Sequence, residues 1–264
     1  MKTAARSLAA VCAAAAIATS IATADESERI QTDRPSISSS ANTVPPGSLQ
    51  IEAGAGYSRT SLGGKPADRE FTLDVTLRAG LTDRMEIRLE GQPLVVTRGE
   101  QDDTGNGDVS LQAKYRFFDG SRGHGWPTLA VLPFVTFPIA HAPHGTKSPD
   151  FGLAGLASFT LPWKLSLDVN AGVGGIAQRP SGYLAQGAAS AALSRDIGER
   201  WSTYLEVFFA SPAERGADSS LGFDAGVQFF VTPYLALDAA GQTALAGPGP
   251  DYAFRAGLSV RFGR

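Results

Sequence analysis

The chain of 264 residues has a single cysteine, Cys12, and only three histidines. Without a second thiol, an intrachain disulfide and a site built from several cysteine ligands are both excluded. Acidic residues slightly outnumber lysine and arginine, and the formal net charge of -3 offers no basic surface for nucleic acid. Beyond the first two dozen residues there is also no apolar run of the roughly 20 residues that a membrane-spanning helix needs.

Residues 1–24 are predicted to be a secretory signal peptide. Lys2 and Arg6 precede an apolar run at residues 8–18, and a small-residue cleavage site follows at residues 22–24. Cleavage there removes the only cysteine, so the mature chain has no thiol chemistry. We therefore expect a protein that is exported from the bacterial cytoplasm.

From Ser48 to the C-terminus, apolar residues alternate with polar or small residues with a period of two. In residues 49–58, Leu, Ile, Ala, Ala and Tyr alternate with Gln, Glu, Gly, Gly and Ser, and residues 71–81 repeat the pattern. Such alternation places apolar and polar side chains on opposite faces of a strand. Because every second wall residue of a membrane barrel can be polar, a mean hydropathy of -0.05 does not contradict a membrane location.

The pattern predicts about twelve strands, each long enough to cross a bilayer at a tilt, which takes roughly 9 to 11 residues. They are residues 48–59, 69–81, 85–96, 107–118, 127–140, 151–161, 164–175, 183–194, 201–210, 220–231, 234–243 and 252–262. Short turns alternate with longer loops rich in Gly, Pro, Asp and Ser. We therefore predict an all-β fold, a transmembrane antiparallel up-and-down β-barrel of the Gram-negative outer membrane at residues 48–264. The predicted strand at 127–140 is irregular, because Pro133 and Pro138 remove ladder donors and both its faces are apolar.

Aromatic residues gather near the predicted strand ends, where rings prefer the boundary between water and lipid. In the last strand, Arg255, Gly257, Val260 and Phe262 match the spacing of the signal that the barrel assembly machinery recognises. The expected partners are that machinery, outer-membrane lipids and lipopolysaccharide. The alternative is a soluble β-sandwich or lipocalin-like barrel whose aromatics form the core, but such folds lack the long and short alternation of loops.

Charged residues on the polar side of the strands are expected to face the lumen, because Arg or Lys facing lipid costs roughly 2 to 4 kcal/mol at the midplane. The lumen-lining candidates are Asp74, Arg78, Glu86, Arg88, Glu90, Asp108, Lys114, Arg116, Asp168, Glu206, Asp224, Asp238, Arg255 and Arg261. The strands between residues 164 and 243 contribute acids alone, whereas the bases lie on those between 69 and 118 and on the last one. This asymmetry predicts a transverse field and a basic wall that favours anions such as aromatic acids. Asp224, Glu206 and Arg255 are the expected solute contacts in the upper lumen.

Residues 31–35, Gln-Thr-Asp-Arg-Pro, are followed from residue 44 by Val-Pro-Pro-Gly-Ser-Leu-Gln-Ile-Glu-Ala-Gly. With the segments at 80–87, 107–117 and 133–138, they resemble transporter-type outer-membrane barrels of the MetA-pathway of phenol degradation family. The resemblance covers nearly all of the mature chain. It departs at Ser36, where the family commonly has an acidic residue. It implies an outer-membrane protein that passes small organic molecules, aromatic ones among them.

A barrel of about twelve strands is expected to leave a narrow passage, because eight strands are filled by side chains and sixteen enclose an aqueous channel. We therefore expect a passive, size-limited pore or transporter for small organic solutes. Residues 25–47 are predicted to be irregular. Asp33 and Arg34 are candidates for a plug that pairs with lumen charges, and a disordered periplasmic tail is the alternative. A structural barrel with a closed, salt-bridged lumen is the main alternative function.

An enzyme is not expected. An outer-membrane lipid hydrolase needs a histidine held rigidly, but His124, His141 and His144 fall in a predicted turn and a predicted loop. A metal site at His141 and His144 would have too few ligands. The sequence therefore predicts no catalytic residues, no metal and no cofactor.

Overall fold

The computed structural model describes residues 29–61, 63, 67–99, 102–121, 125–140, 145, 148–178 and 181–263. The predicted signal peptide lies outside these residues. Within the described ranges, no helix has the length and apolar character that a membrane crossing requires. The strands are β1 (Leu49–Thr60), β2 (Asp68–Thr82), β3 (Met85–Arg98), β4 (Asp103–Gly105), β5 (Val109–Phe118), β6 (Thr128–Phe137), β7 (Asp150–Leu161), β8 (Leu165–Ala177), β9 (Tyr183–Ile197), β10 (Trp201–Ala210), β11 (Ser220–Thr232), β12 (Leu235–Ala246) and β13 (Tyr252–Phe262).

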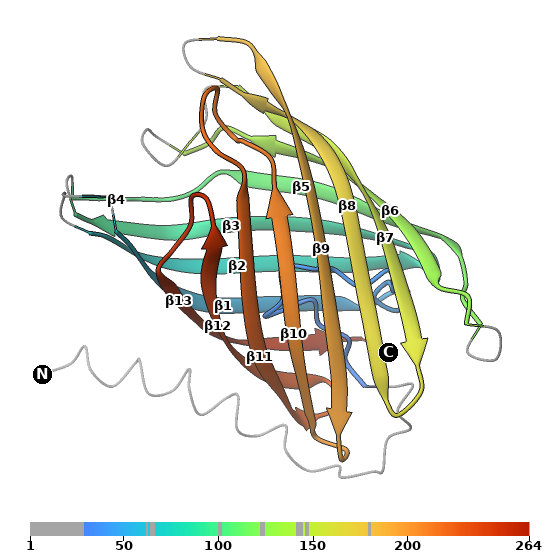
Figure 1. Cartoon of the computed structure of the whole chain (residues 1–264). Helices are drawn as coiled ribbons and strands as arrows, with labels where there is room; N and C mark the ends of the chain where they lie inside the picture. Colours follow the sequence, from blue (N-terminus) through green and yellow to red (C-terminus); the bar gives the residue numbers. More distant parts are fainter. Residues whose placement is uncertain are drawn as a thin grey trace, which may run out of the picture.

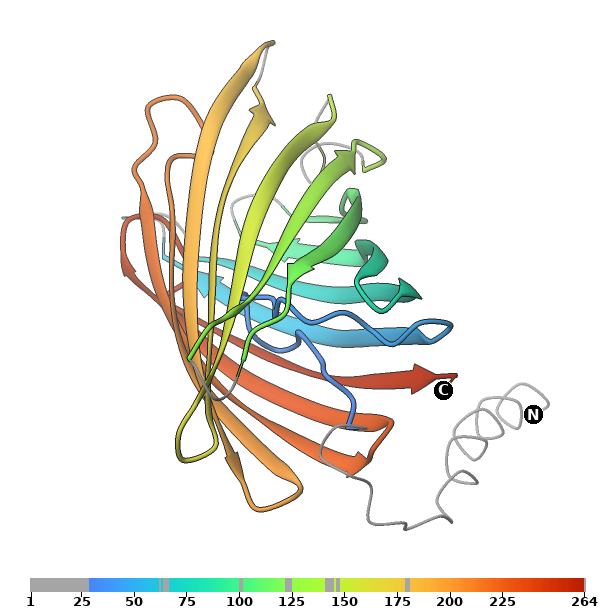
Figure 2. The same cartoon turned by 90° about the vertical axis from the view of Figure 1, so that its right-hand side faces the viewer.

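Twelve of these strands form a closed antiparallel barrel (Figures 1 and 2). Neighbours in sequence pair with each other, and the ring closes where β1 pairs with β13, from Leu49 opposite Phe262 to Arg59 opposite Tyr252. β4 is a short addition to this ring, paired with β3 at Val95, Val96 and Thr97. The predicted up-and-down barrel of about twelve strands is confirmed.

The two ends of the barrel differ in their connections. β1 begins and β13 ends at the same end as the tight turns β2–β3, β7–β8, β9–β10 and β11–β12. Outer-membrane barrels keep such turns and both termini in the periplasm. We call this the periplasmic end and the opposite one the outer end.

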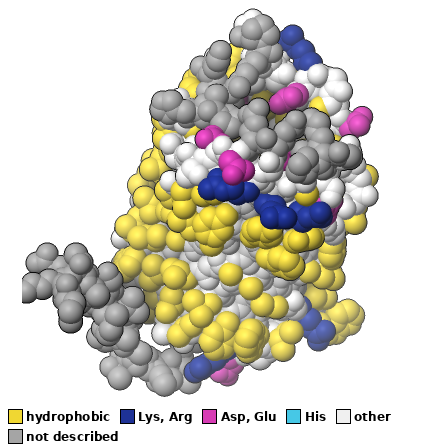
Figure 3. All heavy atoms as spheres, turned by 90° about the vertical axis from the view of Figure 1, so that its left-hand side faces the viewer, with side chains coloured by type: hydrophobic (Ala, Val, Ile, Leu, Met, Phe, Trp, Pro, Cys, Tyr) yellow, Lys and Arg dark blue, Asp and Glu magenta, His cyan; other side chains and the backbone are white. Residues whose placement is uncertain are grey.

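Alternation along each strand gives the wall two chemically different faces. On β1, Gln50 and Glu52 point into the barrel and are each 1% exposed, whereas Leu49 points outward and is 43% exposed. Outward-facing apolar side chains on the other strands extend this surface into a broad band, with charged side chains above and below it (Figure 3). The band is the surface that contacts membrane lipid.

Aromatic rings meet at both borders of this band, as predicted. Tyr57 and Tyr252 pair at the outer end, with ring centroids 6.5 Å apart. Trp201 and Phe229 pair at the periplasmic end, with centroids 4.7 Å apart. Rings at these positions keep an apolar body in lipid and a polar edge near water.

Most strand boundaries differ from the predicted ones by one to three residues, and the two on β5 and β6 have a visible cause. β5 begins at Val109 instead of residue 107, and the Asp108 carboxylate accepts a hydrogen bond from the backbone N–H of Ala140 at 2.9 Å. β6 ends at Phe137 instead of residue 140, because Pro138 has no N–H to continue the ladder. Both boundaries lie at the outer end, where the chain passes between the wall and a loop.

The assignment of the outward face to lipid can be tested at Leu205, which lies mid-strand on β10 and is 56% exposed. We expect Leu205→Arg to lower the free energy of unfolding by about 2 to 4 kcal/mol, because a cation then faces hydrocarbon. Ile197→Arg, next to a periplasmic turn, serves as the control and should cost no more than about 1 kcal/mol. Urea unfolding in liposomes measures both, and equal losses would contradict the assignment.

Candidate functional site

The barrel is not empty, because residues 29–47 lie inside it (Figure 2, dark blue). We call this segment the plug. Near its start, the N–H of Ile30 donates to the carbonyl of Pro233 at 2.7 Å in a periplasmic turn. Near its end, the N–H of Gly47 donates to the carbonyl of Gly80 at 2.9 Å, close to the start of β1. The plug therefore enters the lumen from the periplasmic end, turns inside it and returns to the same end.

Asp33 is the electrostatic centre of the plug. Its Oδ2 atom lies 2.9 Å from Arg88 Nη1, 3.3 Å from Arg78 Nη1 and 3.3 Å from Lys114 Nζ. Burial by itself would raise the pKa of Asp33, but the Coulombic attraction of Arg78, Lys114 and Arg88 together outweighs it and holds this pKa well below the usual value. The carboxylate thus stays ionised and binds three neighbouring strands.

The same bases are also paired with the wall. Arg78 lies 2.8 Å from Glu52 and 3.0 Å from Glu86, and Lys114 Nζ lies 3.6 Å from Glu86. Lys114 also donates to the backbone carbonyls of Ser40, at 2.6 Å, and Asn42, at 3.1 Å. The plug and the wall acids thus neutralise Arg78, Arg88 and Lys114, so that these three bases present no free positive charge to a solute.

Arg34 occupies a slot between the first and last strands. Its guanidinium bonds to Asp238 of β12, with Nη2 3.2 Å from Oδ1 and Nε 3.3 Å from Oδ2. It lies against Gly54 and Gly257, which face each other across the β1–β13 ladder, and a Cβ atom on either residue would overlap the guanidinium. The two glycines are therefore required by this close approach.

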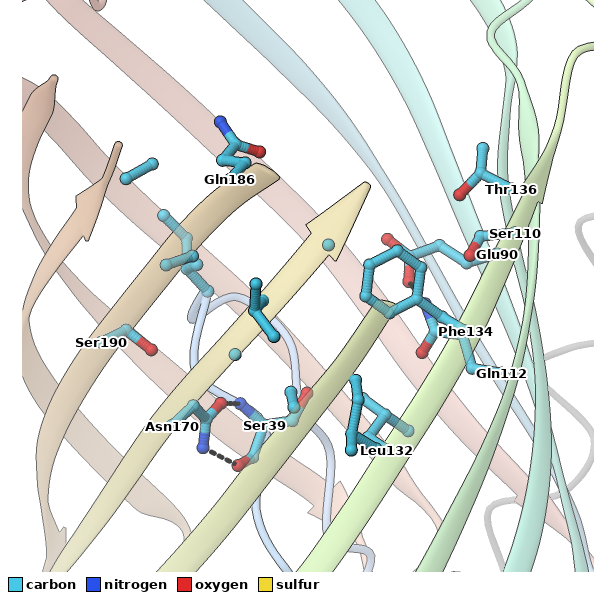
Figure 4. A pocket seen from close by; sticks show the side chains of 18 of the residues that line it. Ser39, Glu90, Ser110, Gln112, Leu132, Phe134, Thr136, Asn170, Gln186 and Ser190 are labelled. Atoms are coloured by element: carbon cyan, nitrogen blue, oxygen red, sulfur yellow. Dashed lines mark hydrogen bonds between the residues drawn. The ribbon is translucent and has the colours of Figure 1, made fainter. Parts of the chain in front are cut away.

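The turn of the plug is held by Glu206 of β10. This carboxylate accepts hydrogen bonds from the N–H groups of Ile37, at 2.8 Å, and Ser38, at 2.6 Å, and from the Ser38 hydroxyl. The next residue, Ser39, exchanges two backbone hydrogen bonds with the Asn170 side chain, at 2.7 and 2.9 Å (Figure 4). Polar wall side chains thus satisfy a backbone that forms no strand.

The remaining candidate charges are engaged elsewhere in the wall. Asp224 is paired with Arg255, and Asp168 accepts a hydrogen bond from the Ser158 hydroxyl. Arg116 lies 3.1 Å from Asp119 at the periplasmic rim. Arg261 stacks over the Tyr234 ring at 5.3 Å. With the plug in place, Glu206 and Asp224 are 1% and 0% exposed, and of the three expected solute contacts only Arg255 lines a cavity.

Some wall residues that bind the plug are not among the predicted lumen-lining candidates. Glu52 accepts a hydrogen bond from the Thr32 hydroxyl at 3.1 Å, and the hydroxyls of Thr32 and Ser259 lie 2.8 Å apart. Glu52 has the same strand parity as Gln50, so alternation could have identified it. Uncharged residues such as Ser259 give no comparable signal.

Above the turn of the plug lie two adjoining cavities of about 740 and 450 Å³, which share Ile37, Asp74 and Glu90 among their lining residues. We call them together the outer chamber. Its polar lining includes Asp74, Glu90, Asp108, Ser110, Gln112 and Thr136, and its apolar lining includes Leu132, Phe134, Leu156, Ile176 and Phe208 (Figure 4). Three predicted lumen acids, Asp74, Glu90 and Asp108, therefore line an actual cavity. The apolar lining residues Leu132 and Phe134 belong to β6, the strand predicted at 127–140 to be apolar on both faces.

Among the residues that the structure describes, no group of three or more His, Cys, Asp or Glu side chains is placed to hold a metal ion. His124, His141 and His144 lie outside the described residues.

Comparison with solved structures places the fold among outer-membrane channels. An outer-membrane channel of Pseudomonas putida F1 is 15% identical, with 89% of this chain and 100% of that chain covered and a TM-score of 0.69. The NanC porin is 11% identical, with 79% and 98% covered and a TM-score of 0.55. The KdgM porin is 8% identical, with 81% and 99% covered and a TM-score of 0.52. At these identities the likeness concerns the fold, which is that of a porin-like barrel of the Gram-negative outer membrane.

A comparison with curated proteins found no match. A family model, in contrast, matches almost the whole barrel and most of the plug, from residue 32 to residue 262. The chain therefore belongs to the family described as "Putative MetA-pathway of phenol degradation".

Proposed function

We propose that the protein is a passive, size-limited channel for small organic solutes, aromatic ones among them, and that the plug closes its periplasmic side. The observation that carries this proposal is the outer chamber, which ends on the plug at Ile37. Although it is apolar, Ile37 stays 43% exposed there. Concave cavities with apolar walls and a few convergent polar groups are typical binding sites for small organic molecules.

The width of the barrel supports a size limit. Twelve strands lie between the eight that side chains fill and the sixteen that enclose an aqueous channel. A segment of chain lying across such a lumen narrows it further. Passage from the chamber to the periplasm therefore requires the plug to shift.

The way in which the plug is held makes such a shift feasible. Its described residues form no strand, and wall side chains hold it: Glu206 and Asn170 at the turn, Asp238 at Arg34, and three bases at Asp33. A shift of the turn breaks the contacts of Glu206 and Asn170, while the ion pairs of Asp33 and every ladder of the wall stay intact. The wall can thus stay folded while the plug moves.

Two other functions remain as alternatives. A purely structural barrel is favoured by the balanced charges around Asp33, because ion pairs in the interior also stabilise a narrow barrel that conducts nothing. A lipid hydrolase has less support, since the neighbours named above are a channel and two porins.

We also propose that lipopolysaccharide and the barrel assembly machinery are partners, the latter through β13. Val260 and Phe262 lie on the outward face of this strand, whereas Arg255 and Gly257 lie on its lumen face. A machine that receives the strand from the lipid side would meet the two apolar residues.

Deleting residues 29–40 should raise single-channel conductance several-fold in planar bilayers, because the chain that crosses the lumen is removed. The deletion also uncovers buried bases, so heat-dependent gel mobility must first show that the barrel folds. A folded deletion variant with unchanged conductance would refute closure by the plug.

A reversible lock tests the same point without removing any chain. The hydroxyls of Ser38 and Ser190 lie 2.7 Å apart. We expect Ser38→Cys with Ser190→Cys to form a disulfide that suppresses channel opening under oxidation, and opening should return with a reductant. Each single variant is the control. Opening that is insensitive to oxidation, in a variant with the disulfide demonstrated by mass spectrometry, would show that the plug need not move.

The docking of Arg34 can be measured separately. Its side chain is 13% exposed and that of Asp238 only 1%, so Arg34→Ala leaves a buried carboxylate without its cation. We predict a loss of about 3 to 5 kcal/mol in unfolding free energy, together with more frequent channel opening. Adding Asp238→Asn should recover much of the stability, because the uncompensated charge is gone. Additive losses in the double variant would show that the two residues act independently.

A further inference from the structure

The outer chamber carries an excess of acidic groups among its described lining residues. The acids are Asp33, Glu52, Glu70, Asp74, Glu90 and Asp108, and the bases are Arg34, Arg88 and Arg255. Each of these bases is already paired: Arg34 with Asp238, Arg88 with Asp33 and Arg255 with Asp224. The cations of the lining are therefore neutralised before any solute arrives.

Two of the acids have a different environment. Asp74 accepts hydrogen bonds from the amide of Gln92, at 2.8 Å, and from the hydroxyl of Thr72, at 3.3 Å. Glu90 accepts one from the amide of Gln112, at 2.9 Å, and remains exposed within the chamber. Their hydrogen-bond partners are uncharged, and neither carboxylate forms an ion pair with a described residue. A negative charge in a water-filled cleft with low-dielectric walls attracts cations and repels anions.

An apolar surface stands next to these carboxylates. Phe134 of β6 lies opposite Gln112 of β5, and on β3, the next strand, Glu90 lies two residues beyond the partner of Gln112, towards the outer end. The Phe134 ring lies against Gly152 of β7, where a Cβ atom on residue 152 would come 2.6 Å from ring carbons. Glycine thus keeps the ring close to the wall and leaves the chamber clear. Two strand spacings and two residues along the strand separate the backbone positions of Phe134 and Glu90, which is about 12 Å.

Because the side chains of Phe134 and Glu90 both extend into the lumen, the gap left between them is shorter than this and suits a single aromatic ring that carries a short polar arm. A ring packed on Phe134 would bring an amine or a hydroxyl on such an arm towards Glu90. An amine or hydroxyl can donate a hydrogen bond to a carboxylate, whereas a second carboxylate cannot and is repelled. Shape and charge therefore select the same kind of solute.

Building on the proposed function, we propose that the outer chamber is the selectivity site of the channel and takes solutes with an apolar body and a hydrogen-bond-donating head, amines above alcohols, in preference to carboxylates. Glu90 binds the head, Asp74 of the neighbouring strand adds negative charge to the chamber, and Phe134 packs against the body. This order is the reverse of the anion preference expected from the sequence.

The test compares benzylamine, benzyl alcohol and benzoate, which share one ring and differ in the head. Binding to the full barrel in detergent, followed by saturation-transfer NMR, should favour benzylamine over benzoate by about three- to tenfold, the effect of one charge at short range in a hydrated site. Asp74→Asn with Glu90→Gln should abolish this preference. Phe134→Ala should weaken all three ligands and keep their order.

The matched control is Glu214→Gln with Asp218→Asn, which removes two exposed carboxylates from the loop between β10 and β11. It should leave the preference unchanged, and native gel mobility after mild heating confirms folding of each variant. Benzoate binding as tightly as benzylamine, or a preference that survives in the Asp74 and Glu90 variant, would overturn the proposal.

The binding assay needs no open channel, so the two proposals can fail separately. If no condition opens a channel but the ligand order holds, transport is refuted and the chemistry of the chamber stands. If channels open but the ligand order is reversed, only the selectivity proposal fails. Reversal potentials of the plug-deleted protein in a salt gradient add a second readout, which should show cation preference that Asp74→Asn with Glu90→Gln reduces.

Discussion

The interior of this barrel depends on one constraint, which is that a charge removed from water must have a partner. Arg78, Arg88 and Lys114 are each no more than 5% exposed. Wall acids compensate them only in part, and Asp33 of the plug completes the balance. A carboxylate that serves three bases cannot leave without exposing all of them to solvent or stranding them unpaired. The plug is thus part of the electrostatic structure of the wall, and its position follows from charge more than from shape.

The same constraint separates the lumen into two zones with different chemistry. On the periplasmic side, ions are paired and covered by the plug. On the outer side, Asp74 and Glu90 meet only neutral donors, and an apolar surface stands beside them. A solute in the outer chamber therefore meets carboxylates that have no cationic partner, while the cations of the lining are paired with acids.

The wall was predictable from the sequence, whereas the pairing inside it was only partly so. Strict alternation identifies which side chains of the strands face the lumen, so the bases on β2, β3 and β5 could be named as candidates, and Asp33 and Arg34 could be named as charges of the irregular segment before the first strand. Alternation gives no information on which lumen charges meet, because that depends on the path of an irregular segment through the barrel. The predicted transverse field therefore omits the neutralisation of Arg78 and Lys114 by Asp33, and it omits the charge of Glu52. The slot for Arg34 was also beyond prediction, since Gly54 and Gly257 lie about 200 positions apart and come together only when the ring closes.

That slot lies on the seam between the first and last strands, with its counter-ion on β12. The slot forms only when β1 and β13 pair, because Gly54 belongs to one strand and Gly257 to the other. Docking of Arg34 is consequently coupled to the final step of assembly, when the two ends of the sheet are joined. In a chain whose β1 and β13 have not paired, the N-terminal segment lacks this binding place, and only the closed barrel retains it. Occupancy of the slot is in this sense a built-in indicator of completed closure.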